Sequence, residues 1–291
     1  MKRKDYGLLF AIISSFFSSI ATVFAASAVK LLNPFALIAG INLLAGVFFI
    51  IVLKFYYKTD VLGVLRKNKK DIALTTFLRI NIAQVILAFG LLYTEGIKAI
   101  FFTKIEPYFV LLWHWLYRRE KIYRKQVLLL AIHLSGSFLL STSGNIGILG
   151  KTQLGDLLVI SAMAITAFAY GYATRLSKSI GSVASNGLTS LIGGTFTLPL
   201  LLIFPLPQFS AVGLSHLLLT AILLNIVGLT LWFEALKTVK GWIVSAVRAI
   251  GPIAGAGAAF VLFGQTLTQM QILGAIMVVA TSFLITREHK E

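Results

Sequence analysis

The sequence contains no cysteine, and only 12% of its 291 residues are charged. Without cysteine the chain can form no disulfide bond, no thiolate nucleophile and no Cys-based metal site. Soluble domains usually carry about 25% charged residues, so this scarcity of charge argues against a soluble domain. Acidic residues are especially few, with 10 Asp and Glu against 26 Lys and Arg, which leaves a net charge of +16.

The motifs of common enzymes are also missing from the sequence. There is no H-E-x-x-H zinc motif, no P-loop and no G-x-S-x-G nucleophile elbow. His114 and His133 have no other ligands at a metal-binding spacing. We therefore predict no catalytic residue, no metal and no cofactor, and we expect that a gradient or an exchange reaction, and not ATP, drives any transport.

What the chain has instead is apolar sequence, with 58% hydrophobic residues and a mean hydropathy of +0.90. A transmembrane helix needs about 20 mostly apolar residues. The N-terminal run after Lys4 resembles a signal peptide, but it is long enough to span and many spans follow it. The sequence predicts an all-α membrane protein with ten transmembrane helices, near residues 6–29, 35–53, 72–94, 98–117, 127–143, 155–175, 183–204, 214–235, 241–263 and 268–286.

The distribution of Lys and Arg predicts the orientation of these helices. With the N-terminus inside, the inner segments hold 20 of the basic residues and the outer segments hold 3, namely Lys30, Lys98 and Lys151. This bias follows the positive-inside rule. It predicts a multi-pass protein of the plasma (inner) membrane with both termini cytoplasmic. It also accounts for the basic pI without nucleic acid, because these charges meet an anionic lipid leaflet.

Two stretches of the sequence resemble each other at an offset of 145 residues. They are GLLYTEGIKAIFFTKIEP at 90–107 and ALKTVKGWIVSAVRAIGP at 235–252. The matching pairs are Leu91 with Leu236, Gly96 with Gly241 and Pro107 with Pro252. We predict two five-span repeats, residues 1–145 and 150–288. Because five is odd, the second repeat must be inverted, and inverted repeats with interrupted helices are typical of secondary transporters with a site near the membrane midplane.

Several segments resemble the EamA family of the drug/metabolite transporter superfamily. They are EPYFVLLWHWLYRREKI at 106–122, LGDLLVISAMAITAFAYGYATRLSK at 154–178 and GPIAGAGAAFVLFGQTLT at 251–268. Members typically carry a Pro in the fourth span and a Gly-Glu at its end, where this chain has Arg119 and Glu120. The second half departs from that pattern with Gly264 and Gln265. The resemblance implies ten spans in two repeats, and it leaves open which metabolite, amino acid, nucleotide sugar or drug is moved.

Three basic residues, Arg79, Lys104 and Arg248, lie inside predicted spans. Charged residues inside a membrane rarely face lipid, so we predict that they line a polar cavity and bind substrate. Each has a structural alternative. Lys104 is roughly 9 Å from the outer end of its span, which allows snorkelling to the interface, and Arg248 can bind helix-end carbonyls. Arg79 can snorkel to the inner interface or pair with Glu106.

Glu106 and the two prolines complete the predicted site. Pro107 and Pro252 each remove a backbone hydrogen bond and should break their helices beside Lys104 and Arg248. Glu106 is either a structural partner of Arg79 or Lys104, a proton carrier, or the partner of a substrate amine. Asn81 and Gln84 are expected either to line a polar groove or to hold helices together.

Aromatic residues near the span ends are expected mostly as anchors at the membrane interface, and stacking on substrate is the alternative for some of them. They are Trp113, Trp115, Tyr117, Trp232 and Trp242.

The sequence favours a secondary transporter that moves a small anionic metabolite or an amino acid by alternating access, because three cations against one carboxylate leave a surplus of positive charge. Proton coupling and exchange are both open, and so is the oligomeric state. One alternative is an exporter of hydrophobic or cationic compounds, in which the basic residues are structural. The other is a membrane scaffold or lipid-handling protein that does not transport.

Overall fold

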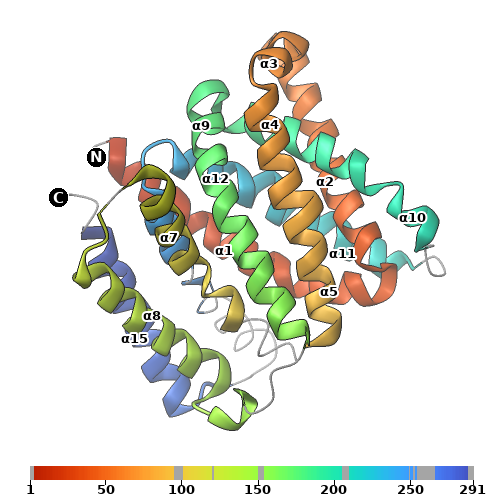
Figure 1. Cartoon of the computed structure of the whole chain (residues 1–291). Helices are drawn as coiled ribbons and strands as arrows, with labels where there is room; N and C mark the ends of the chain where they lie inside the picture. Colours follow the sequence, from red (N-terminus) through yellow and green to blue (C-terminus); the bar gives the residue numbers. More distant parts are fainter. Residues whose placement is uncertain are drawn as a thin grey trace.

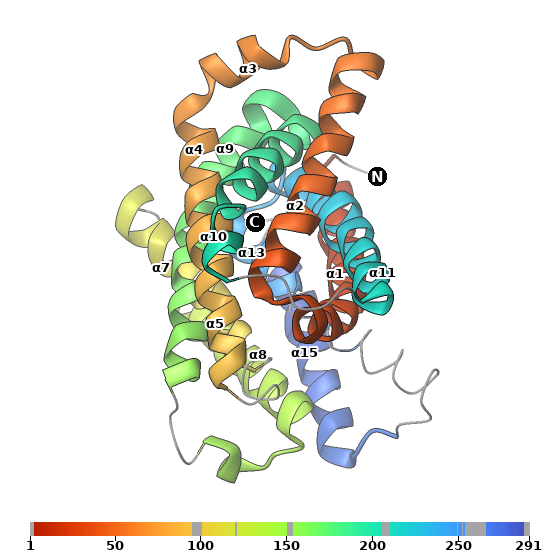
Figure 2. The ribbon, with the colours of Figure 1, turned by 90° about the vertical axis from the view of Figure 1, so that its right-hand side faces the viewer.

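The computed structural model describes residues 3–94, 101–119, 121–149, 154–204, 210–248, 250–251, 253 and 266–287, and it contains no β-strand among them. The helices pack side by side as a bundle (Figures 1 and 2). The described residues therefore adopt the predicted all-α architecture.

The chain begins with two long helices, α1 (Arg3–Leu32) and α2 (Pro34–Ile51), and α2 continues into a short π-helix, η1 (Val52–Tyr56). Asn33 separates α1 from α2 and has a φ of 85°. Its side-chain oxygen accepts a hydrogen bond of 2.8 Å from the backbone N–H of Ala36. Pro34 occupies the first turn of α2, where its missing N–H costs nothing. This cap ends one helix and starts the next.

Two further long helical segments each contain a π-helix in the middle. In the first, η2 (Phe77–Gln84) lies between α4 (Lys69–Thr76) and α5 (Val85–Tyr93). The short α3 (Val61–Lys67) comes before α4. In the second, η4 (Ala221–Gly228) lies between α11 (Ala211–Thr220) and α12 (Leu229–Leu236). π-Helical turns are rare and often mark functional sites.

The sixth and seventh predicted spans lie in α9 (Leu154–Thr197), which consists of two helices joined directly at Gly181, and the short α10 (Leu200–Ile203) follows. The chain changes direction at Gly181, whose φ of 81° and ψ of 166° are not helical. Asn33 has nearly the same backbone angles, with a ψ of 155°. The two corners are thus built alike, one with glycine and one with asparagine, which are the residues that best tolerate positive φ.

The remaining helices are α7 (Glu106–Arg118), α8 (Arg124–Thr142), η3 (Ile146–Leu149), α13 (Gly241–Arg248) and α15 (Gln269–Arg287). α8 and α15 have the same length, pack against each other, and lie together at one side of the bundle (Figures 1 and 2). They approach closely because Gly136 and Gly274 face each other, and a Cβ on either would lie within 3.0 Å of the other's carbonyl oxygen.

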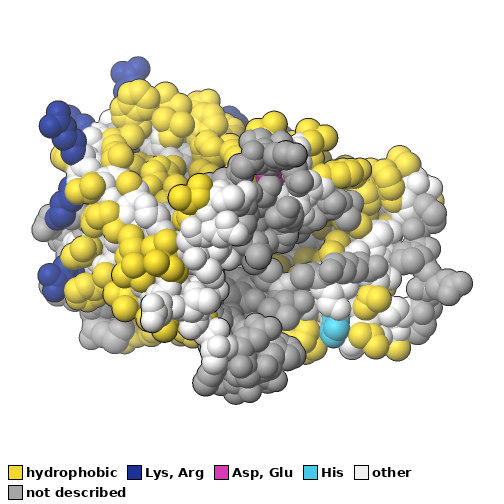
Figure 3. Space-filling view, turned by 90° about the horizontal axis from the view of Figure 1, so that it is seen from below, with side chains coloured by type: hydrophobic (Ala, Val, Ile, Leu, Met, Phe, Trp, Pro, Cys, Tyr) yellow, Lys and Arg dark blue, Asp and Glu magenta, His cyan; other side chains and the backbone are white. Residues whose placement is uncertain are grey.

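Seven helical segments among the described residues are long and apolar enough to cross a membrane. They cover eight of the predicted spans, because Leu154–Ile203 contains two. The predicted spans 98–117 and 241–263 are described only in part, so the count of ten remains a prediction. Many large apolar side chains of these helices are exposed, as expected for a surface in lipid. In Figure 3, hydrophobic side chains cover much of the face that is not grey, and the visible Lys and Arg gather along one edge.

The largest core cluster lies where α1, α7, α8, α9, α12, α13 and α15 meet. Its largest side chains include Tyr170, Trp232 and Trp242, which are 0%, 2% and 2% exposed. The interpretation of Trp232 and Trp242 as interfacial anchors is therefore wrong. Their positions along the spans suit the interface, but the rotation of α12 and α13 turns both rings into the core.

Candidate functional site

The predicted fourth span is interrupted at Lys104 and Ile105. Residues 101–103 are helical, and then the backbone N–H groups of Lys104 and Ile105 bond to the carbonyls of Phe101 and Phe102 at 2.9 and 3.2 Å, in a tight turn. α7 starts anew at Glu106, with Pro107 in its first turn. Pro107 thus begins a helix, where a proline is tolerated, and the break lies immediately before it. Pro252, the equivalent residue in the second half, lies outside the described residues.

This break places the carboxylate of Glu106 at a junction of three helices. Its Oε1 accepts hydrogen bonds from the hydroxyl of Tyr170 in α9, at 2.6 Å, and from the hydroxyl of Ser245 in α13, at 2.5 Å. Trp232 in α12 donates its indole N–H to the Tyr170 oxygen at 3.3 Å. The carboxylate is therefore fixed by hydroxyl groups from helices far apart in the sequence.

Arg79 lies in η2, near the ring of Trp232. Only 6% of the residue is exposed, so it does not snorkel to an interface. Its Cζ lies over the rings of Trp232 and Phe233, at 5.9 and 5.7 Å from their centroids. Its Nε and Nη2 are buried and have no hydrogen-bond partner in the part of the chain that the structure describes. The guanidinium is stabilised by ring faces while two of its donors stay unsatisfied.

Lys104 and Arg248 lie in the same region. Arg248 is close enough to repel the charges of Arg79 and Lys104. Glu106 is close enough to attract the charge of Lys104. Arg248 is the last residue of α13, and its carbonyl accepts a hydrogen bond of 2.7 Å from Ser15 in α1.

Two ion pairs between described residues, Arg175 with Asp71 and Lys237 with Glu234, both involve partly exposed side chains. Glu106 forms none with the three central cations, so a structural ion pair of Glu106 with Arg79 or Lys104 is not present in this conformation.

His133 in α8 is a further buried titratable group near Lys104. Its Nδ1 lies 2.9 Å from the hydroxyl of Thr281 in α15. The single proton of that hydroxyl is donated to the carbonyl of Met277, at 2.6 Å, so the hydroxyl must accept from Nδ1–H. Nε2 is then the lone-pair nitrogen, and it has no partner among the described residues.

Comparison with known proteins identifies the family. A family model described as the EamA-like transporter family matches the chain twice, over residues 5–142 and 153–287. The chain belongs to the EamA-like transporter family. It is 20% identical to the uncharacterized transporter YetK of Bacillus subtilis, over 89% of this chain and 80% of that one. It is 22% identical to an uncharacterized transporter of Methanothermobacter thermautotrophicus, over 97% and 87%.

A solved crystal structure with 12% identity has the same fold, with a TM-score of 0.81 over 98% of this chain and 99% of that one. The chain is therefore a membrane transporter of this family, and its relatives leave the substrate, the coupling and the mechanism unspecified.

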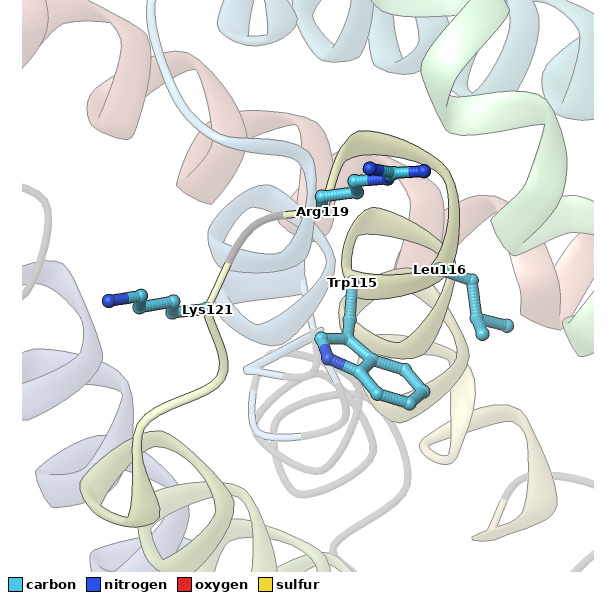
Figure 4. A pocket seen from close by; sticks show the side chains of 4 residues that line it. All are labelled: Trp115, Leu116, Arg119 and Lys121. Carbon is cyan, nitrogen blue, oxygen red and sulfur yellow. The ribbon is translucent and has the colours of Figure 1, made fainter.

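Two cavities in this EamA-like transporter lie at the C-terminal end of α7, away from the central cations. Each has a volume of about 280 Å³. Trp115, Leu116, Arg119 and Lys121 line the first (Figure 4). Arg119 and Lys121 point away from each other in Figure 4, so they do not converge on one ligand. We therefore place the candidate site at Glu106 and the central cations, where the buried polar groups converge.

The second cavity has a side-chain contact path to Glu106. It is lined by Leu111, His114, Trp115, Lys121, Ile122, Tyr123, Gln126, Lys240 and Trp242. His114 and Tyr170 both lie against Gly241, where an added Cβ would be 3.4 and 3.1 Å from them. Tyr170 in turn contacts Glu106. This cavity is thus separated from the central carboxylate by a short path of buried side chains.

Asn81 and Gln84, the polar residues that follow Arg79, hold helices together. Asn81 donates to the carbonyl of Gly193 at 3.0 Å, and Gln84 accepts from Asn42 at 3.2 Å. Asn42 also accepts from Asn225 at 3.1 Å. Of the two interpretations for Asn81 and Gln84, these contacts fit helix packing and not a polar groove.

Sequence reasoning missed the groups that hold Glu106 in place. Tyr170, Ser245 and Trp232 reach it from three helices whose packing the sequence does not specify. The available signal was weak, because a Tyr or a Ser inside an apolar span is common. The sequence shows only that His133 has no second metal ligand at a suitable spacing. It gives no indication that His133 contacts Thr281 in α15.

Proposed function

We propose that this EamA-like transporter is a ten-span secondary transporter that moves a small anionic metabolite or an amino acid by alternating access between two inverted five-helix repeats. One observation carries the substrate class. Among the described residues, Arg79, Lys104 and Arg248 lie in one region with the carboxylate of Glu106, whose hydrogen bonds are made to hydroxyl groups. Three cations against one carboxylate leave a formal charge of +2, which an anionic substrate would neutralise.

The inverted repeat is supported by matching elements in the two halves. The π-helices η2 and η4 begin at residues 77 and 221, which are 144 positions apart, and both have eight residues. α8 and α15 begin at residues 124 and 269, which are 145 positions apart, and both have 19 residues. The corners at Asn33 and Gly181 share their backbone conformation. The twofold match of the family model is consistent with boundaries near 1–145 and 150–288.

Contacts at the helix ends support the predicted orientation. Residues predicted inside contact one another, since Arg175 pairs with Asp71 at 2.8 Å and Ser179 donates to Asn68 at 2.8 Å. Residues predicted outside do the same, since Asn33 donates to the carbonyl of Phe204 at 3.2 Å. These contacts agree with an alternation that starts inside. The bias of Lys and Arg, and not these contacts, is the basis on which we propose cytoplasmic termini and a plasma-membrane location.

In this proposal the carboxylate or phosphate of the substrate meets Lys104 and Arg248, and the break before Pro107 gives the fourth span a flexible point beside Lys104. Glu106 then acts either as a proton carrier or as the partner of a substrate amine. Because the site lies between helices of both halves, rocking of one half against the other would expose it to each side in turn.

The test is transport in proteoliposomes with Lys104→Ala and Arg248→Ala, together with Lys178→Ala as a control that removes an exposed cation. A panel of small anions and amino acids is first screened for counterflow by the wild-type protein. We expect both central variants to raise the apparent KM or abolish uptake, and the control to behave like the wild type. Unchanged KM and rate in both central variants would refute the proposed anion site.

One observation favours a second candidate, the export of hydrophobic or cationic compounds. Glu106 accepts a hydrogen bond from the buried Tyr170, and the buried Trp232 donates a hydrogen bond to Tyr170. Aromatic faces and one carboxylate suit an organic cation. Thermal stabilisation of the purified protein by cations, and not by anions, would favour this candidate.

A further inference from the structure

The buried guanidinium of Arg79 has two N–H donors with no hydrogen-bond partner among the described residues. A guanidinium this deeply buried normally pairs with a carboxylate or bonds to carbonyl groups, because unsatisfied buried charge is costly. The rings of Trp232 and Phe233 attract its positive charge, but they offer no lone pairs to in-plane N–H groups. The unsatisfied donors are Nε and Nη2.

These two nitrogens form one edge of the guanidinium, and their N–H bonds point in the same direction. The chain itself shows what this edge binds. Arg175 donates through the same two atoms to Asp71, with Nε 3.3 Å from Oδ2 and Nη2 2.8 Å from Oδ1. Two parallel N–H donors fit the two oxygens of one carboxylate, which is the bidentate arrangement that makes Arg–carboxylate pairs strong and directional.

The surroundings hold this edge in place. Trp232 lies over Arg79, donates to Tyr170, and is packed edge-on against the Tyr170 ring at 5.1 Å. Tyr170 is bonded in turn to Glu106. The carboxylate reached along this chain of contacts is therefore bonded to hydroxyl groups, and no described residue accepts a hydrogen bond from the Nε or Nη2 of Arg79.

We propose that the Nε–Nη2 edge of Arg79 binds a carboxylate group of the transported compound in a bidentate manner, against the faces of Trp232 and Phe233. This inference rests on the proposed anion transport and assigns it a substrate class, compounds with at least one carboxylate. The two N–H groups of this edge match both oxygens of one carboxylate, whereas a phosphate has further oxygens that would need donors from other residues. Arg79 thus distinguishes a carboxylate from an uncharged amide of the same shape.

The experiment uses the full-length purified protein and measures ligand affinity by thermal stabilisation. The probes are propionate, benzoate and glutarate, each with its carboxamide and its phosphonate. We expect carboxylates to stabilise the wild-type protein more than their carboxamides do. Arg79→Lys, which keeps the charge but loses the two-pronged geometry, should weaken carboxylate binding roughly tenfold or more, and Arg79→Gln should do so further. Affinity for the carboxamides should not change.

Controls separate this inference from the proposed function. Arg175→Lys breaks the same kind of edge at an exposed site and should leave all affinities unchanged. If carboxylates bind both Arg79 variants as tightly as the wild type, while Lys104→Ala and Arg248→Ala lose binding, the inference is wrong and the proposed anion site stands. A wild-type preference for phosphonates over carboxylates would also overturn the inference and leave the anion site standing. If no anion binds the wild type, both fail.

A second measurement covers the case in which Arg79→Gln does not fold. Because the Trp232 ring centroid lies 5.9 Å from the Arg79 Cζ, a carboxylate bound there should change tryptophan fluorescence in the wild-type protein. Trp232→Phe should abolish that change. A carboxylate that stabilises the wild type with no fluorescence change dependent on Trp232 would overturn the assignment.

Discussion

Tyr170 donates its hydroxyl hydrogen to Glu106 over 2.6 Å, and this bond joins α9 to the first turn of α7. Ser245 adds a second hydrogen bond to the same carboxylate oxygen. The contact thus connects the helix interrupted at Lys104 with helices of the second half of the chain. It is the point at which the candidate site and the packing of the bundle depend on each other.

Replacing Tyr170 by Phe should destabilise the protein and impair transport. The change keeps the ring packed against Trp232 but removes one of the donors to Glu106. Losing a buried hydrogen bond to a charged group costs about 1.5–3 kcal/mol, which should lower the thermal midpoint by several degrees. Tyr172→Phe on the same helix is the control, because no hydrogen bond of its hydroxyl is part of the site. Equal midpoints for the two variants would contradict the prediction.

Glu106→Gln should preserve the fold while changing energy coupling. The amide keeps an oxygen that can accept from Tyr170 and Ser245, so the midpoint should stay close to that of the wild type. If Glu106 carries the coupling proton, the variant should retain counterflow and lose uptake driven by a pH gradient. Both are measured in the same proteoliposomes. Gradient-driven accumulation at the wild-type level would exclude this role.

An alanine at the Gly181 corner should destabilise the protein. Its φ of 81° and ψ of 166° are unfavourable for any residue with a Cβ, although no atom lies within 4 Å of an added Cβ. Gly181→Ala should therefore lower stability by roughly 1 kcal/mol or more. Gly171→Ala is the matched control, because it also has open space but lies within the helix, and it should be neutral or stabilising. The reverse order of thermal midpoints would refute the argument.

Thr281→Val should loosen the contact between α8 and α15. The substitution preserves shape but removes the oxygen that accepts from His133, leaving a buried ring N–H without a partner. Such a group costs about 1–3 kcal/mol. Thr286→Val is the control, since its hydroxyl bonds only to the nearby carbonyl of Phe283. Thermal unfolding of the two variants should differ clearly, and similar midpoints would show that the His133 bond contributes little.

The predicted orientation can be tested directly, because the natural chain has no cysteine. Leu62 and Ile146 are 65% and 74% exposed, and lie in segments predicted inside and outside, respectively. In intact cells a membrane-impermeant maleimide should label Ile146→Cys, and label Leu62→Cys only after the membrane is permeabilised. The wild-type protein is the blank. The opposite pattern would invert the topology, and labelling of both from outside would refute the span count between them.

The sequence alone determined that this chain lies in lipid and that it is an all-α membrane protein. Low charge, long apolar runs and the bias of Lys and Arg follow from the cost of placing polar groups in hydrocarbon, and this cost acts on each segment separately. For the same reason the helical fold was predictable, whereas the family was indicated by the resemblance of particular segments such as 106–122 and 154–178. Pro107 could be read as a helix break, because proline acts on its own backbone.

The tertiary structure decided how the charged residues are used. Which way Arg79 points, and that Trp232 and Trp242 are core residues, depends on the rotation of each helix against its neighbours, and a change in that rotation leaves the composition of a span unchanged. The partners of Glu106 come from residues 64 and 139 positions away. Contacts over such distances arise only when helices pack, so no local pattern in the sequence could specify them.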